Sequence, residues 1–253
     1  MNRADSRKKN LLEFLNKRGY ATIEELAQNF SVTPQTMRRD INQLADEGRV
    51  QRFHGGVGMP LGTENIIYDE RKRLFPEEKR RIAELVARHI PDGASLCINI
   101  GTTTEAVAVA LLEHKSLRIL TNNLNVARIC AGNPSFEVII AGGTVRSHDL
   151  GVTGTETEHF IREFRMDFGI IGISGIDAEG NLLDYDYKEV SVARTIIDHS
   201  RRVFLACDSS KFGRPAMVRA GHVGQLDAIF SNAPLSSRWQ TMIRDAGTSL
   251  YLA

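Results

Sequence analysis

Two closely spaced helices with well-marked beginnings constrain this chain more than any other feature of its sequence. The first is expected to begin after Thr22, which can form a capping box with Glu25 three positions later. The second is expected to begin after Thr33 as N-cap, with Pro34 in the first helical position, where proline is favoured. Only a short polar turn separates them. The pattern predicts a helix-turn-helix within residues 22–58.

The second of these helices has an apolar face and a polar face. Apolar residues at the helical period are expected to face a core: Met37, Ile41, Leu44 and Ala45. The polar face suits the major groove of DNA, because arginine bonds to guanine, asparagine and glutamine bond to adenine, and threonine bonds to phosphate or packs on thymine. The DNA-binding candidates on this helix are Thr33, Gln35, Thr36, Arg38, Arg39 and Asn42.

A short basic strand and a glycine turn are expected after this helix, as in a wing. Gly48 favours the left-handed conformation that ends a helix, and residues 49–56 have the pattern of a hairpin. Arg49, Arg52 and His54 are predicted to lie along the DNA backbone, where cations neutralise phosphate without reading sequence. The alternative is a small helical domain whose arginines are merely solvated.

Length and charge fit a DNA-binding domain joined to a larger one. The chain has 253 residues, of which 42% are hydrophobic and 25% charged, so it can bury a sizeable core. Residues 1–59 hold ten Lys and Arg against seven Asp and Glu, a net charge of +3, and the remainder holds 22 against 24, a net charge of −2. The basic excess falls on the helix-turn-helix, although a solvated basic face would give the same count.

The cysteines indicate neither a zinc site nor a disulfide framework. Cys97, Cys130 and Cys207 are far apart and form no CxxC pair, and two of them end or lie within apolar runs, as core residues do. No metal and no cofactor are expected. The N-terminus lacks the apolar segment of a signal peptide, and no run is long enough to span a bilayer. A cytoplasmic protein without membrane contact is expected.

The sequence divides into three segments. A DNA-binding domain is expected over residues 1–58, with a first helix from about residue 5 to residue 18. A linker is expected over residues 59–76; it is rich in Pro and Gly and includes the start of a charged helix at Tyr68. An effector-binding domain is expected over residues 77–253, beginning with a helix over residues 77–89.

Short apolar strands alternate with helical stretches beyond residue 93. The strands are expected at residues 95–100, 117–121, 137–141, 169–173, 203–207 and 228–231. Their apolar runs are continuous, as in strands that helices cover on both faces. This part of the chain is therefore predicted to be an α/β domain with a mainly parallel sheet.

Polar residues follow most of these strands, and ligands of open α/β sheets bind beyond the carboxyl ends of strands. The first strand leads through Gly101, Thr102, Thr103 and Thr104 into a helix, so that backbone N–H groups and hydroxyls can face an anion. A Gly-Thr turn that only caps a helix is the alternative. The sequence predicts a phosphate-binding turn at this strand end.

Three other strand ends add groups suited to a phosphorylated ligand. Asparagine amides suit sugar or polyol hydroxyls, although asparagines also cap helices and Gly-Gly pairs also form plain turns. Lys211 offers a point charge for phosphate, and Asp208 offers an acceptor for hydroxyls. We predict that one pocket collects these groups. The further candidates are Thr121, Asn122, Asn123, Gly142, Gly143, Arg146, Asp208 and Lys211.

Several of these segments resemble the DeoR-type family of bacterial repressors. Residues 31–40 match the family's helix-turn-helix signature, and the likeness continues through nearly the whole chain. The segments that resemble the family's effector domain are 99–103, 121–126, 141–143 and 208–213. The resemblance implies a winged helix-turn-helix that binds double-stranded operator DNA, a sensor for a phosphorylated small molecule, and a homo-oligomer.

The resemblance also carries implications for single residues. Glu189, at the start of a helix, matches a glutamate of the family's effector pocket, whereas Asp184 and Asp186 before it are expected to be solvated. Residues 169–177 and 210–214 look most like family members of glycerol metabolism, which implies glycerol 3-phosphate as effector. At Asn99 the chain departs from the family pattern, in which aspartate is usual.

Three functions follow from these features. A repressor whose operator binding is relieved by a sugar or polyol phosphate is favoured, because the DNA module has a purpose only if the occupancy of the pocket is reported to the operator. The effector domain also resembles ribose-5-phosphate-type isomerases, so an isomerase with an accessory DNA domain and Glu189 as base is the alternative. The third function is a DNA-binding scaffold without a ligand. No catalytic residue is expected, because the sequence shows no base paired with an acid.

Overall fold

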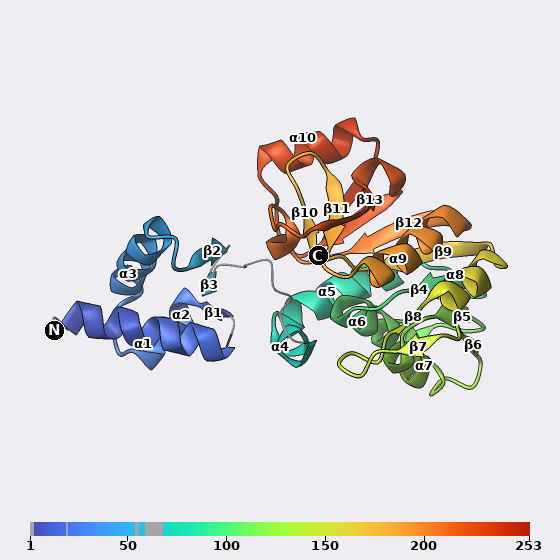
Figure 1. The fold of residues 1–253 in the computed structure, drawn as a ribbon, viewed down its shortest axis with the longest axis horizontal. Coiled ribbons are helices and arrows are strands. Elements are labelled where there is room, and N and C mark those ends of the chain that lie inside the picture. The colour runs from blue at the N-terminus through green and yellow to red at the C-terminus, as the bar shows by residue number, and fades with distance from the viewer. Residues whose placement is uncertain (1–2, 19, 54–55, 59–67) are drawn as a thin grey trace. The chain divides into compact units, whose positions relative to one another are not determined.

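The computed structural model describes residues 3–18, 20–53, 56–58 and 68–253 (Figure 1). The chain forms two compact units, Met1–Leu74 and Phe75–Ala253, and the division falls within the expected linker over residues 59–76. His54 and Gly55 of the expected wing lie outside the described residues, as do residues 59–67.

The first unit is a winged helix-turn-helix. Its strands form an antiparallel sheet in the order β1-β3-β2. A short helix, α4 (Tyr68–Arg73), ends the unit, at the position where the sequence predicted a charged helix to begin. The elements before it are α1 (Arg3–Arg18), β1 (Tyr20–Thr22), α2 (Ile23–Asn29), α3 (Pro34–Asp46), β2 (Gln51–Phe53) and β3 (Gly56–Gly58).

The helices of this unit begin where their capping residues predict. Thr22 forms the expected capping box with Glu25 at the start of α2, and Thr33 caps α3 with Pro34 in its first turn. Gly48 has a φ of +68°, the left-handed conformation predicted for the end of α3. The apolar face of α3 packs with the other helices in one core of Leu11, Leu15, Leu26, Met37, Ile41 and Leu44, all of them buried.

The second unit is an α/β domain with one seven-stranded parallel sheet in the order β15-β14-β12-β9-β4-β5-β6. Strands β4, β5 and β6 follow one another outward, and the chain then returns to the other side of β4. The switch between the two directions lies between β4 and β9. The strands are β4 (Ser95–Ile98), β5 (Arg118–Thr121), β6 (Glu137–Ile140), β9 (Met166–Ile171), β12 (Ser200–Ala206), β14 (Ala228–Ser231) and β15 (Ser249–Leu252).

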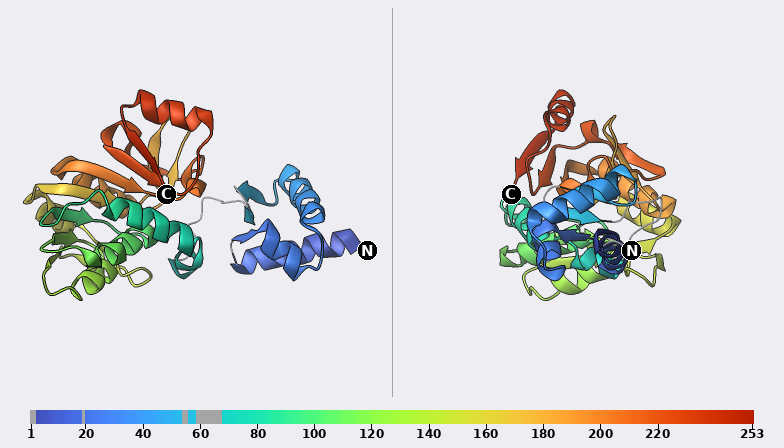
Figure 2. Two further views of the ribbon diagram at one scale, coloured as in Figure 1. Left: turned by 180° about the vertical axis from the view of Figure 1, so that it is seen from behind. Right: turned by 90° about the vertical axis from the view of Figure 1, so that its left-hand side faces the viewer.

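Helices cover both faces of this sheet, as can be followed in Figures 1 and 2. One face packs on α5 (Pro76–Ala87), α6 (Thr102–Ala110) and α7 (Leu124–Cys130). The other packs on α8 (Thr155–Arg162) and α9 (Tyr187–His199). Neighbouring residues of β4 divide between the two cores: Leu96 and Ile98 join the first and Cys97 the second. All three cysteines are buried and free, as expected of core residues.

Several short elements were not predicted from the sequence. The strands β10 (Gly175–Ile176), β11 (Asn181–Asp184) and β13 (Val218–His222) form a small antiparallel sheet. Figure 1 shows this sheet at the top of the unit with α10 (Ser237–Asp245). A two-stranded ribbon, β7 (Thr144–Val145) with β8 (Val152–Thr153), follows β6. No helix among the described residues is long and apolar enough to cross a membrane.

Candidate DNA-binding and effector sites

Helix α3 presents most of the predicted DNA-reading residues to solvent. Gln35, Arg38, Arg39 and Asn42 are exposed. Thr36 is half-buried, and its backbone N–H donates to Thr33 Oγ1 at 3.2 Å, so Thr33 serves first as the cap of the helix. The remaining exposed groups include donors and acceptors for base edges and for phosphate.

Two contacts fix this helix within the first unit. Arg7 Nε donates to the buried Asp40 Oδ2 at 2.5 Å, which joins α1 to α3, and this hydrogen bond raises the pKa of Arg7. Arg52 Nη1 donates to Asn42 Oδ1 at 2.8 Å, which joins the wing strand β2 to the reading face. The wing and the reading helix are therefore coupled through two residues that the sequence predicted to contact DNA.

Two further arginines of the first unit form loose ion pairs. Arg38 lies 3.8 Å from Glu24, and Arg49 lies 3.7 Å from Glu47, with side chains about half exposed. Exposed pairs of this kind contribute little to stability, about 0 to 1 kcal/mol. Breaking these ion pairs, as a contact with DNA phosphate would require, therefore costs the folded protein little stability.

The carboxyl ends of β4 and β9 meet at the switch point of the sheet. Asn99 Oδ1 accepts from Gly172 N at 2.9 Å, so the side chain that departs from the family pattern joins these two strand ends. Gly101 has a φ of +155°, which favours glycine, and α6 begins directly after it. Thr104 Oγ1 lies 2.8 Å from the carbonyl oxygen of Gly101 and 2.9 Å from that of Asn99, so this hydroxyl stabilises the turn.

The residues after β5 have structural partners as well as open groups. Thr121 Oγ1 donates to Ile98 O at 2.6 Å, and Asn123 caps α7 and donates to Glu105 Oε1 at 3.3 Å. Asn122 Nδ2 donates to Val152 O at 2.9 Å. Asn122 Oδ1, by contrast, is buried and accepts no hydrogen bond from any described residue.

The two glycines after β6 differ in how much space a side chain would have. Gly143 has a φ of +148°, and a Cβ there would lie 2.2 Å from Thr157 Oγ1 and 2.9 Å from Thr153 O. A Cβ on Gly142 would meet nothing within 4 Å. Only Gly143 therefore requires glycine, because a side chain at this position would clash with its neighbours. This requirement agrees with the alternative that the glycine pair forms a plain turn.

Arg146 is surrounded by three carboxylates. Its Nε donates to Asp149 Oδ1 at 3.1 Å, and its Nη1 and Nη2 lie 2.8 Å from Asp186 and 2.9 Å from Glu189. Burial by itself would lower the pKa of Arg146, but the charges of Glu189 and Asp149 outweigh it and raise the pKa. The structure thus brings Arg146 and Glu189 together. Within the described ranges, no cluster of His, Cys, Asp and Glu is arranged to hold a metal ion.

The expectation that Asp184 and Asp186 are solvated is wrong for Asp184 and holds in part for Asp186, whose side chain is 34% exposed. Asp184 is buried, and its Oδ1 accepts from Ser174 Oγ at 2.8 Å and from Tyr185 N at 2.7 Å. Burial would raise the pKa of Asp186, but hydrogen bonds from the Lys188 N–H and from Arg146 lower it overall. The loop folds back on neighbouring strand ends, so both carboxylates have protein partners.

The loop after β12 carries two cations. Asp208 is buried, and its Oδ1 accepts from Ser210 N at 2.9 Å, which fixes the turn that carries the half-buried Lys211. Arg214 follows, is 2% exposed, and has no hydrogen-bond partner at Nε or Nη2 among the described residues. Arg214 was not among the residues predicted to bind the effector, although a second cation three positions after Lys211 is visible in the sequence.

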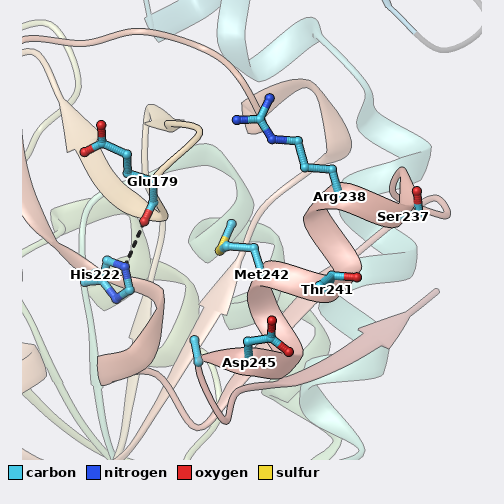
Figure 3. Close-up of a pocket in the computed structure, with 8 residues that line it drawn as sticks. Glu179, His222, Ser237, Arg238, Thr241, Met242 and Asp245 are labelled. Carbon is cyan, nitrogen blue, oxygen red and sulfur yellow. Dashed lines mark hydrogen bonds between the residues drawn. The ribbon is translucent and has the colours of Figure 1, made fainter.

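A separate cleft of about 680 Å³ lies between α10 and the small sheet (Figure 3). Arg238, Met242 and Asp245 line it from α10, and His222 lines it beside Glu179, whose carbonyl oxygen lies 3.0 Å from His222 Nε2. None of the predicted effector-binding residues lines this cleft. It is therefore distinct from the candidate site at the ends of the strands.

Comparison with known proteins identifies both units. Residues 7–61 match the DeoR-like helix-turn-helix domain, and residues 75–233 match the DeoR C terminal sensor domain. The chain is 51% identical to the glycerol-3-phosphate regulon repressor of Escherichia coli (strain K12), over 88% of this chain and 89% of that protein. It is 49% identical to the glycerol-3-phosphate regulon repressor of Haemophilus influenzae, over 89% of this chain and 88% of that protein.

The solved structures are more distant. Ribose 5 phosphate isomerase A from Neisseria gonorrhoeae is 15% identical and aligns with a TM-score of 0.37, over 53% of this chain and 52% of that chain. A score of that size has no bearing on function. The two domain matches and the close relatives agree with the likeness carried by the helix-turn-helix and the strand ends. This chain belongs to the DeoR family.

Proposed function

We propose that this chain is a DNA-binding transcriptional repressor that a phosphorylated sugar or polyol releases from its operator. Glycerol 3-phosphate is the first candidate, because relatives that are about half identical over most of the chain are named glycerol-3-phosphate regulon repressors. Residues 1–58 would bind DNA and residues 77–253 the effector, with 59–76 between them. The observation that carries the proposal is the exposed cationic face of α3 in a chain of this family.

The proposed DNA contacts are of two kinds. Gln35, Arg38, Arg39 and Asn42 lie on the exposed face of α3 and would reach base edges or phosphates in the major groove. Arg49 and Arg52, with His54, would follow the DNA backbone from the wing. The Arg52–Asn42 hydrogen bond supports this division, because it holds the wing against the reading helix.

The proposed effector site lies at the carboxyl ends of the sheet strands. The first turn of α6 after Gly101 offers backbone N–H groups from Thr102 and Thr103, and Lys211 offers a positive charge from the loop after β12. The unpaired Asn122 Oδ1 offers an acceptor for a hydroxyl. A small ligand with one phosphate and neighbouring hydroxyls fits these groups.

Release from DNA requires an effector that binds the DNA-incompetent arrangement more tightly, since only a difference in affinity shifts a population. One helix-turn-helix covers one half-site, so high affinity for an operator requires paired copies. We therefore propose a symmetric homo-oligomer as the active form.

The test measures binding to a duplex that the protein itself selects from a random library. Fluorescence anisotropy should show that glycerol 3-phosphate weakens binding and that glycerol does not. An equal response to both compounds contradicts the phosphate site. Incubation with ribose 5-phosphate and triose phosphates, followed by NMR, supplies the control, because isomerised product would support the enzyme alternative.

A further inference from the structure

Arg214 carries a buried charge whose hydrogen bonding is incomplete. The residue is 2% exposed, and its Nε and Nη2 atoms have no hydrogen-bond partner among the described residues. Buried polar groups in proteins are nearly always hydrogen-bonded, and unpaired charges are the costliest exceptions. Arginine does not escape this cost by losing its proton. The two donors therefore require a partner that the described chain does not supply.

The two unpaired nitrogens lie on one edge of the guanidinium. N–H groups on this edge point in parallel, the geometry that binds two oxygens of a single carboxylate or phosphate. Arg146 uses the same edge in this way, since its Nε and Nη2 hold the two carboxylate oxygens of Asp149. The buried, unpaired edge of Arg214 therefore has the donor geometry for one oxyanion.

The Arg214 guanidinium already has an aromatic neighbour. Its Cζ lies 5.4 Å from the centre of the Tyr185 ring, a distance at which cation–π attraction stabilises the positive charge. This contact supplies no acceptor for the Nε and Nη2 donors. An anion at that edge would also gain from the low dielectric of a buried position.

The backbone holds Arg214 from both sides. Gly213 N donates to Ile176 O at 2.7 Å, and Tyr185 Oη donates to Pro215 O at 3.0 Å. A Cβ on Gly175 would lie 2.1 Å from the carbonyl oxygen of Arg214, so the loop packs directly on the segment that follows β9. The backbone around Arg214 is thus held against β10 of the small sheet, which restricts the positions open to its side chain and reduces the entropy lost on binding.

The same loop contacts link Arg214 to the other effector candidates. Tyr185 is followed by Asp186, whose carboxylate lies 2.8 Å from Arg146 Nη1. Arg214 N donates to Lys211 O at 3.3 Å, so the two cations lie within one turn of each other. Arg146, in contrast, has its charge matched by three carboxylates.

We propose that Arg214 is the oxyanion receptor of the sensor domain and that it binds the phosphate of the effector. The assignment rests on the proposed function, which supplies the class of effector, a phosphorylated sugar or polyol. Arg214 would bind the phosphate together with the turn after β4 and Lys211, the two groups to which the sequence analysis assigned it. Arg146 instead organises the loops around the site through its carboxylate partners.

The test uses the full chain and measures thermal unfolding with and without ligand. Arg214→Met keeps an unbranched, apolar stem but removes the guanidinium, and with it the charge, the donors and the contact with the Tyr185 ring. The ligand-free variant should have a Tm equal to or above that of the wild type, because an uncompensated buried charge is removed. Glycerol 3-phosphate and inorganic phosphate should raise the Tm of the wild type but not of the variant, with binding weakened about tenfold or more.

Two further variants make the test specific. Arg238 also lies over an aromatic ring, 5.9 Å from the centre of Trp239, but it is exposed, so Arg238→Met is a matched control expected to behave as the wild type. Arg214→Lys keeps a charge but lacks the fork of donors. It should bind phosphate more weakly than the wild type and more tightly than Arg214→Met.

The outcomes separate this assignment from the proposed function. Wild-type affinity for glycerol 3-phosphate in a folded Arg214→Met protein overturns the role of Arg214 and leaves the repressor proposal intact. A lowered ligand-free Tm with unchanged affinity assigns Arg214 a structural role and overturns it equally. If the Met variant does not fold, unchanged affinity in Arg214→Lys has the same consequence. A wild type that binds no sugar phosphate, polyol phosphate or inorganic phosphate contradicts both proposals.

Discussion

Adjacent arginines on α3 have different surroundings. Arg38 lies 3.8 Å from Glu24, whereas Arg39 forms no ion pair with any residue that the structure describes. Both are exposed on the proposed reading face. The helical period turns neighbouring side chains about 100° apart, so the two cannot make the same contact with DNA.

Alanine substitution should show whether Arg38 and Arg39 read bases or contact phosphate. Loss of a base-reading arginine should cost roughly 1–3 kcal/mol on the specific duplex, and loss of a phosphate contact should weaken all duplexes and reduce the salt slope by about one. Anisotropy titrations at several salt concentrations, with Arg38→Ala, Arg39→Ala and the sensor-domain control Arg162→Ala, measure both effects. Wild-type affinity in both α3 variants would show that this helix is not the reader.

The Gly142–Gly143 pair allows a matched test of backbone strain. Gly143→Ala places a Cβ 2.2 Å from Thr157 Oγ1 and 2.9 Å from Thr153 O at a φ of +148°. We expect it to lower the free energy of unfolding by roughly 1–3 kcal/mol. Gly142→Ala meets nothing within 4 Å and should change stability by less than about 0.5 kcal/mol. Urea unfolding measures both variants, and equal effects would contradict the assignment of strain to Gly143.

At the level of elements, Ser95 and Asp167 join β4 to β9 across the centre of the sheet. Ser95 Oγ donates to Asp167 Oδ2 at 2.7 Å, and Ser95 N donates to the same oxygen at 3.0 Å. These hydrogen bonds lower the pKa of Asp167. Since the folded pKa lies below the ordinary value, the pairing stabilises the fold above the ordinary carboxyl range, and this contribution is lost as the pH falls through the folded pKa.

Ser95→Ala should therefore have a pH-dependent effect. Near neutral pH we expect a loss of about 1 kcal/mol, a modest value because the Asp167 side chain is 47% exposed. The loss should shrink as the pH falls below about 4, because the carboxylate is then protonated first in the unfolded state and, at lower pH, in the folded state as well. Urea unfolding across this range, with Ser237→Ala on α10 as control, checks the sign. A loss that grows toward acid would refute the assignment.

The larger elements were predictable because their signals are local. Thr22, Thr33 and Gly48 mark helix boundaries through contacts within a few residues, and the buried parallel strands appear as continuous apolar runs. The small sheet of β10, β11 and β13 has no such signal. Its first strand has only two residues, and β11 pairs with β13 at residues more than 30 positions away in the sequence.

The sequence predicted which types of residue occur at the candidate site better than it predicted which of these residues contact one another. The polar segments after β4, β5 and β12 are visible in the sequence because they interrupt apolar runs. The partners of Arg146 cannot be recognised in the sequence, because Asp186 lies 40 positions away and only the tertiary fold brings the two side chains into contact. Likewise, the burial of Arg214 without partners for Nε and Nη2 among the described residues follows from tertiary packing, which the neighbouring sequence does not indicate.

At the scale of the whole molecule, the proposed function requires that a substitution can change the response to effector without changing the affinity for DNA. Lys211 lies in the sensor domain, and the proposed reading face lies in the other compact unit. Lys211→Ala should keep wild-type affinity for DNA but require at least about tenfold more glycerol 3-phosphate for release. Lys115→Ala, at an exposed position of the same domain, should behave as the wild type. Anisotropy titration with effector measures this, and normal release from the Lys211 variant would contradict a role for this lysine.

The strand order of the sensor domain has a consequence for how the chain folds during synthesis. β4 can pair with β5 soon after both leave the ribosome, but its other edge waits for β9, and 72 positions separate Ser95 from Asp167 across that pair. At about 5–20 residues per second, this interval lasts roughly 4 to 14 s. During that time the inner edge of β4 is an unpaired template for other strands, so slower translation should lengthen the period in which the nascent chain depends on chaperones.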